Sequence, residues 1–402
     1  MIPVAAAEAR ICQALQPTPT EWVAIDQAFG RVLASDLGAG RDHPAAAISA
    51  MDGYAVRTGD LAAGGPLRVV QTAVAGQPVG APLEAGTCAR IFTGALIPPG
   101  ADAILIQENA RRDGDLVSTE SPPSPGQFVR PAGLDFTAGA VLLRAGSVLD
   151  ARKLGLAAAM GHGHVPVHRQ PRVGIAGTGD ELVRPGSAMA AHQIANSNAL
   201  TIAGCVRAFG GMPVDLGIVR DDRDALGALL DAATGLDLLV TSGGASVGDH
   251  DLVAEVLGTR GFALDFWKIA MRPGKPLLFG QLRDVPVLGL PGNPVSTAVC
   301  CLVFLRPALA RLQGQAPTPL PTTRLPLAAP LGTNDQRQDF VRARLLGGAD
   351  GTVRVEPAPR QDSSMLATLA LADALIVRPP HDPPRAADDH VDVVQLVRIT
   401  GF

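Results

Sequence analysis

A predicted strand, residues 285–290, leads into residues 295–312, whose apolar side chains recur at helical spacing. Asn293 is placed to cap this helix, and Pro294 is placed at its first helical position. The first turn of a helix has four unpaired amides and the positive end of the helix dipole, so it favours anions, and Ser296 adds a hydroxyl donor. The motif predicts either an ordinary capped helix or an anion-binding site.

Two cations precede the strand before this helix, and they favour the anion-binding interpretation. Arg272 and Lys275 lie on a short segment, residues 272–276, that contains two prolines and is therefore stiff. Guanidinium and ammonium groups bind oxyanions through charge-assisted hydrogen bonds. The segment therefore supplies positive charge that an ordinary capped helix would not require.

Loops that carry glycines or carboxylates follow successive predicted strands, at residues 177–181, 221–222 and 241–251. Because the carboxyl ends of parallel strands meet at one edge of a sheet, we expect these loops to lie together. Glycines there let backbone amides approach a phosphate or a ring, and the carboxylates of Glu181, Asp221 and Asp251 could hold Mg²⁺. Together these loops predict a phosphorylated ligand with a divalent metal. Asp222, taken by itself, is better explained as a helix cap.

The elements that must position these residues fall into four groups. Predicted helices at 4–15 and 149–160 enclose a β-rich stretch, and from residue 171 strands and helices alternate, as in a doubly wound parallel sheet. After a Pro-rich stretch at 316–321 short strands return, as in a small barrel or sandwich. We expect an α/β plus β fold with a discontinuous helical linker domain (1–30 and 136–170), an inserted β-rich domain (31–135), an α/β domain (171–315) and a C-terminal domain (316–402), which we take as a β-barrel.

Composition narrows the class of protein. The chain has 402 residues, enough for several domains, and its net charge of −4 disfavours a nucleic-acid binder. Its five cysteines include no C-x-x-C pair, which argues against a disulfide framework or a thiolate zinc site. We see neither a signal peptide nor a membrane span in the sequence. A multidomain enzyme of the cytoplasm, with no membrane partner, is the simplest expectation.

Six motifs together resemble a known family. The sequence is similar, in order and through nearly the whole chain, to the MoeA family of molybdopterin molybdenumtransferases, more loosely in the C-terminal region. The motifs that carry this resemblance are residues 51–57, 90–95, 178–182, 241–248, 272–276 and 290–296.

The resemblance implies a fold, a reaction and partners. It implies an elongated homodimer of four-domain subunits with a cleft shared between subunits, related to the molybdopterin-binding region of gephyrin. The reaction it implies converts adenylylated molybdopterin and molybdate into molybdenum cofactor and AMP, with Mg²⁺. The adenylyltransferase that prepares the nucleotide-activated pterin is a further possible partner.

The resemblance also implies functional residues. The catalytic set is Asp52, Thr93, Asp135, Glu181, Asp221 and Asp251, of which the last three would hold the metal. The molybdate set is Arg272, Lys275, Ser296, Arg342 and Ser363. The molybdopterin and nucleotide set is Gly177, Thr178, Gly179, Asp180, Ser242, Gly243, Gly244, Ser246, Gly248, Lys268, Pro291, Gly292, Asn293 and Pro294.

Two positions depart from the family pattern, and several have plainer interpretations. Arg272 stands where many relatives have Lys, and Asp362 stands beside Ser363 where relatives often have Gly, which adds negative charge near the proposed oxyanion site. Lys268 beside Trp267 could be a stacked surface cation, and Arg342 could lie on a solvated strand face. Asp52 could simply fix a turn.

Two other functions share parts of this pattern. A molybdopterin adenylyltransferase would need the α/β domain but not the flanking domains that carry Asp52, Thr93 and Arg342. A non-catalytic dimeric scaffold would need the fold but not carboxylates in a cleft, so Glu181, Asp221 and Asp251 argue against it. The sequence favours the molybdenum-inserting transferase.

Overall fold

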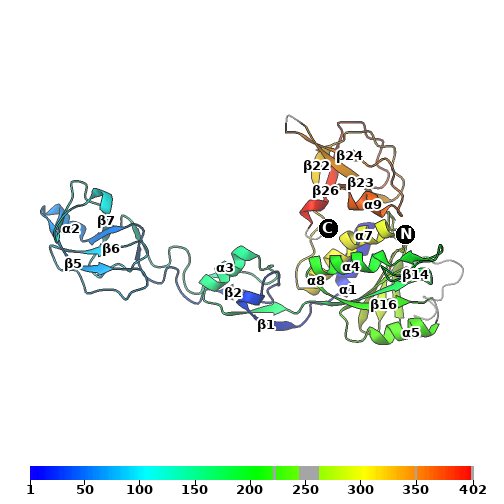
Figure 1. Ribbon diagram of the computed structural model, residues 1–402, viewed down its shortest axis with the longest axis horizontal. Helices are drawn as coiled ribbons and strands as arrows, with labels where there is room; N and C mark the ends of the chain where they lie inside the picture. Colours follow the sequence, from blue (N-terminus) through cyan, green and yellow to red (C-terminus); the bar gives the residue numbers. More distant parts are fainter. Residues whose placement is uncertain (221–222, 244–261, 349–350, 400–402) are drawn as a thin grey trace.

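The protein is an elongated molecule with a β-rich unit at one end and a larger α/β unit at the other (Figure 1). The computed structural model describes residues 1–220, 223–243, 262–348 and 351–399. Part of the predicted site lies outside these residues: Asp221, Asp251, Gly244, Ser246, Gly248 and the helix expected at 250–257.

The β-rich unit, here called the inserted domain, is one six-stranded sheet with a core on each face. Buried or partly buried positions alternate with exposed ones along β5, as in a strand with one face towards the core. The strands run in the order β7 (Ala103–Ile106), β4 (Gly53–Val56), β6 (Thr87–Ile91), β5 (Leu67–Ala73), β9 (Leu116–Ser118) and β8 (Arg111–Asp113), with the helices α2 (Thr58–Ala62) and η2 (Gln107–Asn109).

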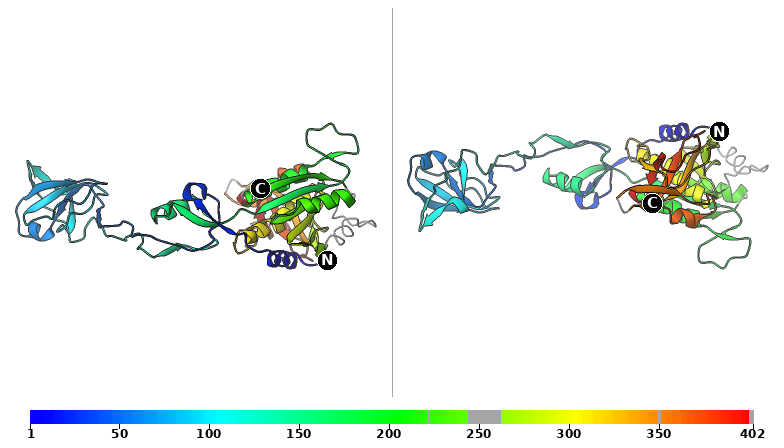
Figure 2. Two further views of the ribbon diagram at one scale, coloured as in Figure 1. Left: turned by 90° about the horizontal axis from the view of Figure 1, so that it is seen from below. Right: turned by 90° about the horizontal axis from the view of Figure 1, so that it is seen from above.

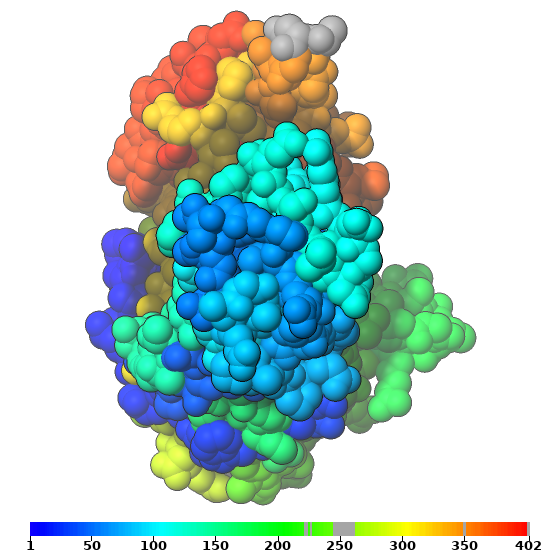
Figure 3. Space-filling view, turned by 90° about the vertical axis from the view of Figure 1, so that its left-hand side faces the viewer, coloured from blue at the N-terminus to red at the C-terminus, as the bar shows by residue number. Residues whose placement is uncertain are grey.

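Two antiparallel chain segments connect the inserted domain to the rest of the molecule. They pair as β2 (Leu37–Gly38) with β11 (Val141–Leu143) and as β3 (Ile48–Ser49) with β10 (Val129–Arg130). Between these pairs the rings of His43 and Phe136 stack with centroids 5.2 Å apart. Figure 3, seen along the long axis, shows the inserted domain in front of the larger unit.

A small linker unit lies between the two ends of the molecule. Its two-stranded sheet joins β1 (Thr20–Ala24) to β12 (His164–His168), beside η1 (Ile25–Gln27) and α3 (Ala151–Ala159). Asp150 caps α3, because its carboxylate accepts a 2.9 Å hydrogen bond from the amide of Lys153. The unit has its own apolar core.

The α/β domain contains a six-stranded sheet with helices on both faces, which confirms the predicted fold class. The strand order is β16 (Met212–Val219), β13 (Arg172–Thr178), β17 (Leu238–Ser242), β21 (Val285–Leu290), β20 (Leu278–Leu282) and β18 (Phe262–Trp267). One face carries α1 (Val4–Ala14), α4 (Ser197–Ala208) and the long helix Pro294–Leu312, and the other carries α5 (Arg223–Ala232) (Figure 1).

One strand of this sheet runs against our expectation of parallel strands. β20 is antiparallel to both of its neighbours, so Leu278 at its start pairs with Gly289 near the end of β21. The reversal matters because it brings the segment before β20, residues 272–276, to the edge where the parallel strands end. The short pair β14 (Leu182–Val183) and β15 (Ile194–Ala195) lies at the base of a segment that projects from this domain (Figure 2).

The long helix consists of α7 (Pro294–Cys300), the π-helical turn η3 (Cys301–Leu305) and α8 (Arg306–Leu312). Among the described residues, this is the one helix that is long and apolar enough to cross a membrane. However, 83% of its most apolar stretch is buried inside the molecule. Its side chains belong to the largest core, together with those of α1 and α4. It is therefore placed as a core helix.

The C-terminal domain is a curled sheet with its own core. Its edges meet through a bridge between Leu327 and Val355, as in a barrel rather than a two-sheet sandwich. A strand of the α/β domain, β19 (Met271–Arg272), extends this sheet. The order is β19, β23 (Gln338–Gly347), β25 (Ala374–Arg378), β26 (His390–Gln395) and β22 (Thr323–Pro326), with β24 (Val353–Pro357) on β23 and the helices α9 (Leu366–Ala370) and η4 (Leu396–Arg398).

The cap of α3 predicts a pH-dependent contribution to stability. Hydrogen bonds from Arg152 and from the Lys153 amide lower the pKa of Asp150 from 3.8 to about 2. A lowered pKa stabilises the folded state fully above the unfolded value, and this contribution is lost as pH falls through the folded value. Asp150→Asn keeps a cap acceptor but not the charge, so wild type should melt at higher temperature than the variant at about pH 6, with the difference vanishing towards about pH 2.

Thermal unfolding followed by circular dichroism across this range would measure the difference. A melting difference between wild type and Asp150→Asn that stays constant from neutral to acid pH would contradict the prediction.

Candidate functional site

A pocket of about 580 Å³ opens at the carboxyl edge of the central sheet. We call it the edge pocket. Residues predicted for the site line much of it: Thr178, Glu181, Ser242, Gly243, Pro291, Gly292, Asn293, Pro294 and Ser296. The loops after β13, β17 and β21 supply these residues, so the expectation that strand ends converge is confirmed for this part of the chain.

The long helix begins at this pocket, but its start differs from the expected cap. Asn293 stands at the N-cap position without a side-chain capping bond, and its Nδ2 donates instead to Ser363 Oγ at 3.0 Å. The amide of Val295 donates to the Ser363 carbonyl at 3.2 Å. Ser296 is 96% buried in the helix yet borders the pocket, and among the described residues no acceptor pairs with its amide.

Two asparagines that sequence reasoning missed help to assemble the pocket. Asn198 Nδ2 donates to Ser242 Oγ at 2.8 Å and to the Gly292 carbonyl at 2.7 Å, which ties the loop after β17 to the loop after β21. Asn196 caps α4 by accepting from the Ala199 amide. Their signal in the sequence was the pair of asparagines before a predicted helix, a pattern typical of helix N-termini.

Several predicted glycines are required by close packing. A Cβ on Gly177 would lie 2.4 Å from Asn196 Nδ2, and one on Gly243 would lie 2.2 Å from the Thr178 carbonyl oxygen. Gly179, with φ +143°, leaves room for the Glu181 carboxylate. Gly177, Gly179 and the exposed Asp180 are not lining residues themselves, and the two glycines allow Thr178 and Glu181 beside them to line the pocket.

The two cations of the segment 272–276 have different surroundings. Arg272 donates through Nε to Asp339 at 3.1 Å and through Nη2 to Asn334 at 3.2 Å, and it lies 3.5 Å from Asp335. These bonds, above all the one to Asp339, raise the pKa of Arg272. Lys275 is exposed, and no acceptor among the described residues pairs with its ammonium group. Lys275 is therefore the cation of this pair that is available to an anion.

The C-terminal domain reaches the pocket through residues 361–366. Arg342 is only 1% exposed, which excludes the solvated face, and its burial lowers its pKa. Its guanidinium donates to Gln361 Oε1 at 3.1 Å and to the Asp362 carbonyl at 2.8 Å. Arg342 therefore holds the segment that brings Ser363 to the helix start, and the neighbouring Ser364 lines the pocket.

The remaining predicted residues lie elsewhere. Lys268 Nζ stacks over the Trp267 ring at 3.5 Å, as in the plainer interpretation. In the inserted domain Asp52 accepts hydrogen bonds from the amide and the hydroxyl of Thr93, at 2.7 and 2.8 Å, which lower its pKa. The exposed Asp135 belongs to the connecting segment, where its amide donates to His43. Within one chain the edge pocket and the Asp52–Thr93 pair are at opposite ends (Figure 1).

The predicted metal site is described only in part. Glu181 lines the edge pocket, whereas Asp221 and Asp251 lie outside the described residues. Elsewhere in the part of the chain that the structure describes, His, Cys, Asp and Glu side chains form no group of three that could hold a metal ion.

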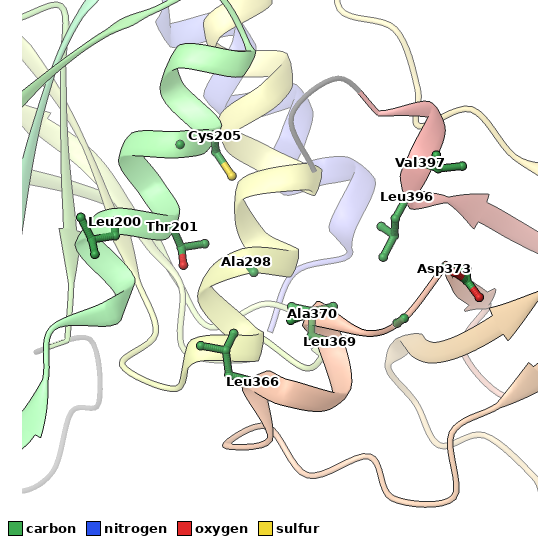
Figure 4. A pocket seen from close by; sticks show the side chains of 12 residues that line it. Leu200, Thr201, Cys205, Ala298, Leu366, Leu369, Ala370, Asp373, Leu396 and Val397 are labelled. Atoms are coloured by element: carbon green, nitrogen blue, oxygen red, sulfur yellow. The ribbon is translucent and has the colours of Figure 1, made fainter. Parts of the chain in front are cut away.

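A second cavity of about 430 Å³ adjoins the edge pocket, since Leu366 borders both. Figure 4 shows its mainly apolar lining, including Leu200 and Cys205 of α4, Ala298 of α7 and Leu396 of η4. Its polar side chains are mainly Thr201 and the carboxylate of Asp373, so it offers an oxyanion few hydrogen-bond donors, whereas hydroxyl and amide side chains line much of the edge pocket. The edge pocket is the better candidate site.

The burial of Arg342 yields a stability prediction. Arg342→Met should leave the Asp362 carbonyl without its donor, while Gln361 keeps only the bond from the backbone amide of residue 342, and should lower the free energy of unfolding by about 1–3 kcal/mol. Arg344→Met, at an exposed position two residues further along the same strand, should change it by no more than about 0.5 kcal/mol. Chemical denaturation would compare them, and equal effects of the two substitutions would rule out this bracing role.

Three regions of the chain, in sequence order, match known protein families. Residues 2–161 match the MoeA N-terminal region (domain I and II), residues 174–311 match a probable molybdopterin binding domain, and residues 324–396 match the MoeA C-terminal region (domain IV). A solved MoeA protein from Pyrococcus horikoshii superposes with a TM-score of 0.85 at 29% identity, covering 98% of this chain and 99% of that one.

Curated relatives agree with these matches. The molybdopterin molybdenumtransferase of Haemophilus influenzae is 36% identical over 365 residues, which are 90% of each chain. Molybdopterin molybdenumtransferase 2 of Mycobacterium tuberculosis is 36% identical over 385 residues, which are 93% of this chain and 94% of the relative. With three consecutive regions matched and relatives of this similarity, the chain belongs to the MoeA family of molybdopterin molybdenumtransferases.

Proposed function

We propose that this protein inserts molybdenum from molybdate into adenylylated molybdopterin, giving molybdenum cofactor and AMP, with the edge pocket as the place of reaction. The enzyme is a transferase of molybdenum cofactor biosynthesis, because relatives that share nine-tenths of their length with it carry that name. The observation that supports this use of the pocket is the helix start, where Ser296 borders the cavity and its amide pairs with no acceptor among the described residues.

The proposed roles start from the residues that line the pocket and from Lys275, which precedes the lining residue Pro276. The loops that carry Thr178 and Ser242 would hold the pterin and phosphate parts, and the helix start would hold molybdate. Molybdate is a tetrahedral dianion, so Lys275 and the Ser296 hydroxyl suit it as a cation and a donor. Arg342 supports this site from behind by holding residues 361–366.

We also propose Mg²⁺ as the metal, with Glu181 as one ligand. A carboxylate oxygen suits this hard cation. When bound, the ion would polarise the phosphoanhydride of the adenylylated substrate. Glu181 borders the pocket where that phosphoanhydride would lie.

The two alternative functions fit less well. A molybdopterin adenylyltransferase would not need the flanking regions, yet both flanking regions match MoeA models. A scaffold would not need the polar pocket lined by Glu181, Ser242 and Ser296. Our further proposal of a cytoplasmic location is supported by the five free cysteines, Cys12, Cys88, Cys205, Cys300 and Cys301.

We propose in addition that the enzyme works as a homodimer with a shared cleft. Asp52 and Thr93 lie at the opposite end of the chain from the edge pocket (Figure 1). If all these residues act in one reaction, the inserted domain of one subunit must reach the pocket of another. The elongated shape supports this arrangement.

The molybdate site predicts a selective defect in Lys275→Ala. Removing the ammonium group should raise the molybdate concentration for half-maximal AMP release about ten- to a hundredfold, since one charge-assisted hydrogen bond contributes roughly 1.5–3 kcal/mol. Binding of adenylylated molybdopterin should be nearly unchanged. AMP release against molybdate concentration and calorimetric titration with the pterin substrate would measure both.

The matched control is Arg283→Ala, which removes a cation from the turn at the other end of β20. It should leave both quantities unaltered. Weaker binding of the adenylylated pterin by Lys275→Ala, with an unaltered molybdate requirement, would place Lys275 at the pyrophosphate instead.

The shared cleft predicts recovery of activity in mixed dimers. Asp52→Ala and Glu181→Ala homodimers should each release little AMP. After subunit exchange, a heterodimer combines one intact pocket with the intact inserted domain of the other subunit, so about half of the dimers should regain one working site. Native mass spectrometry would verify the exchange, and failure to recover AMP release after verified exchange would count against a shared site.

A further inference from the structure

We infer that Arg90 is a positioning residue that holds Asp52 and Thr93 in the geometry needed for the reaction. This inference rests on the proposed function of those two residues. The supporting observation is that the Arg90 guanidinium contacts both the segment that contains Asp52 and the segment that contains Thr93.

Arg90 lies on β6 directly opposite Tyr54 of β4, and the segments that carry Asp52 and Thr93 adjoin these two strands. Its guanidinium is enclosed by two rings, at 5.2 Å from the centroid of Tyr54 and 4.7 Å from that of Phe92. Tyr54 is 5% exposed and belongs to the core of the inserted domain, while Phe92 is partly exposed. Stacking therefore restricts the guanidinium in addition to its hydrogen bonds.

The hydrogen bonds of Arg90 then fix the backbone around Asp52. Nη1 donates to the Gly53 carbonyl at 3.0 Å, and Nη2 donates to Gln107 Oε1 at 2.9 Å. The amide of Gln107 in turn donates to the Asp52 carbonyl at 3.1 Å. The carbonyls of Asp52 and Gly53 are thus held, one through Gln107 and the other by Arg90 directly.

The stacking on Phe92 fixes the other half of the pair. Thr93 follows Phe92 in the chain, and its amide and hydroxyl both donate to Asp52 Oδ1, at 2.7 and 2.8 Å. Asp52 and Thr93 lie at the surface, where such bonds exchange readily with water unless the backbone holds both partners. Arg90 contacts the chain neighbour of each partner, so it limits the relative movement of the two segments.

Arg90→Met tests this role because methionine keeps the aliphatic contacts and removes the planar donors. We expect kcat to fall about ten- to a hundredfold, as for a small misplacement of a reacting group, with the half-saturating concentration of each substrate unchanged. Hydrogen exchange of the peptide that contains Thr93 should become faster. Arg90→Lys should recover activity only in part, because an ammonium group cannot donate in the planar fork.

Arg68→Met on the neighbouring strand β5 is the matched control, since Arg68 is exposed on the same sheet. It should alter neither kcat nor exchange at Thr93. The triple variant Asp52→Ala/Thr93→Ala/Arg90→Met should be no slower than Asp52→Ala/Thr93→Ala, because Arg90 acts through this pair.

The outcomes separate this inference from the proposed function. Full activity of Asp52→Ala would remove the assigned role of Asp52. An inactive Asp52→Ala with a fully active Arg90→Met would overturn the positioning role. A further loss in the triple variant would also overturn it, since Arg90 would then act independently of Asp52 and Thr93.

Discussion

Burial of the helix Pro294–Leu312 is the constraint on which the edge pocket depends. The helix packs between α1, α4 and the sheet, and apolar residues of the C-terminal domain, such as Phe340 and Leu375, belong to the same core. A helix enclosed in this way cannot shift without opening the core of two domains. Its first turn is therefore a rigid wall of the pocket, and donor groups at that turn are preorganised rather than assembled when a ligand binds.

The reversed strand β20 and the strand β19 make the pocket a joint product of two domains. The reversal carries the segment 272–276 to the edge of the sheet, and β19 then pairs with β23 of the C-terminal domain. From the other side, Arg342 fixes the segment in which Ser363 meets Asn293. Polar contacts at the pocket thus depend on how the two domains pack, which explains why a cation in the C-terminal domain matters without lining the cavity.

Local patterns predicted most of the elements, because apolar periodicity records which face of a strand or helix is buried. The strands β13 and β21 and the helix beginning at Pro294 lie where such patterns occur, although β13 extends beyond its predicted apolar run, 173–176. The direction of β20 did not, since a short apolar strand looks the same in either direction. The burial of Arg342 was also hidden, because it depends on Gln361 and Asp362, which lie outside its own strand.

For the site, sequence identified the loops but not every contact within them. Asn293 has the residue type of a cap, yet a tertiary partner, Ser363, takes its side chain. Asn198 joins two loops that are far apart in the sequence, and only the fold brings Ser242 and Gly292 within its reach. The resemblance to a family supplied Asp52 and Thr93, whose distance from the pocket in one chain no local pattern would reveal.

The paired connection to the inserted domain has a consequence for how this chain is built. Both ends of the insertion meet where the amide of Gly139 donates to the Ala39 carbonyl at 2.8 Å and the amide of Ala39 donates to the Ala140 carbonyl at 2.9 Å. Residues 39 and 139 are so close that they could be joined directly if the insertion between them were removed. The apolar cores of the α/β and C-terminal domains contain no residue of this insertion. The insertion is topologically a module: it could be exchanged or lengthened without rethreading the rest of the chain.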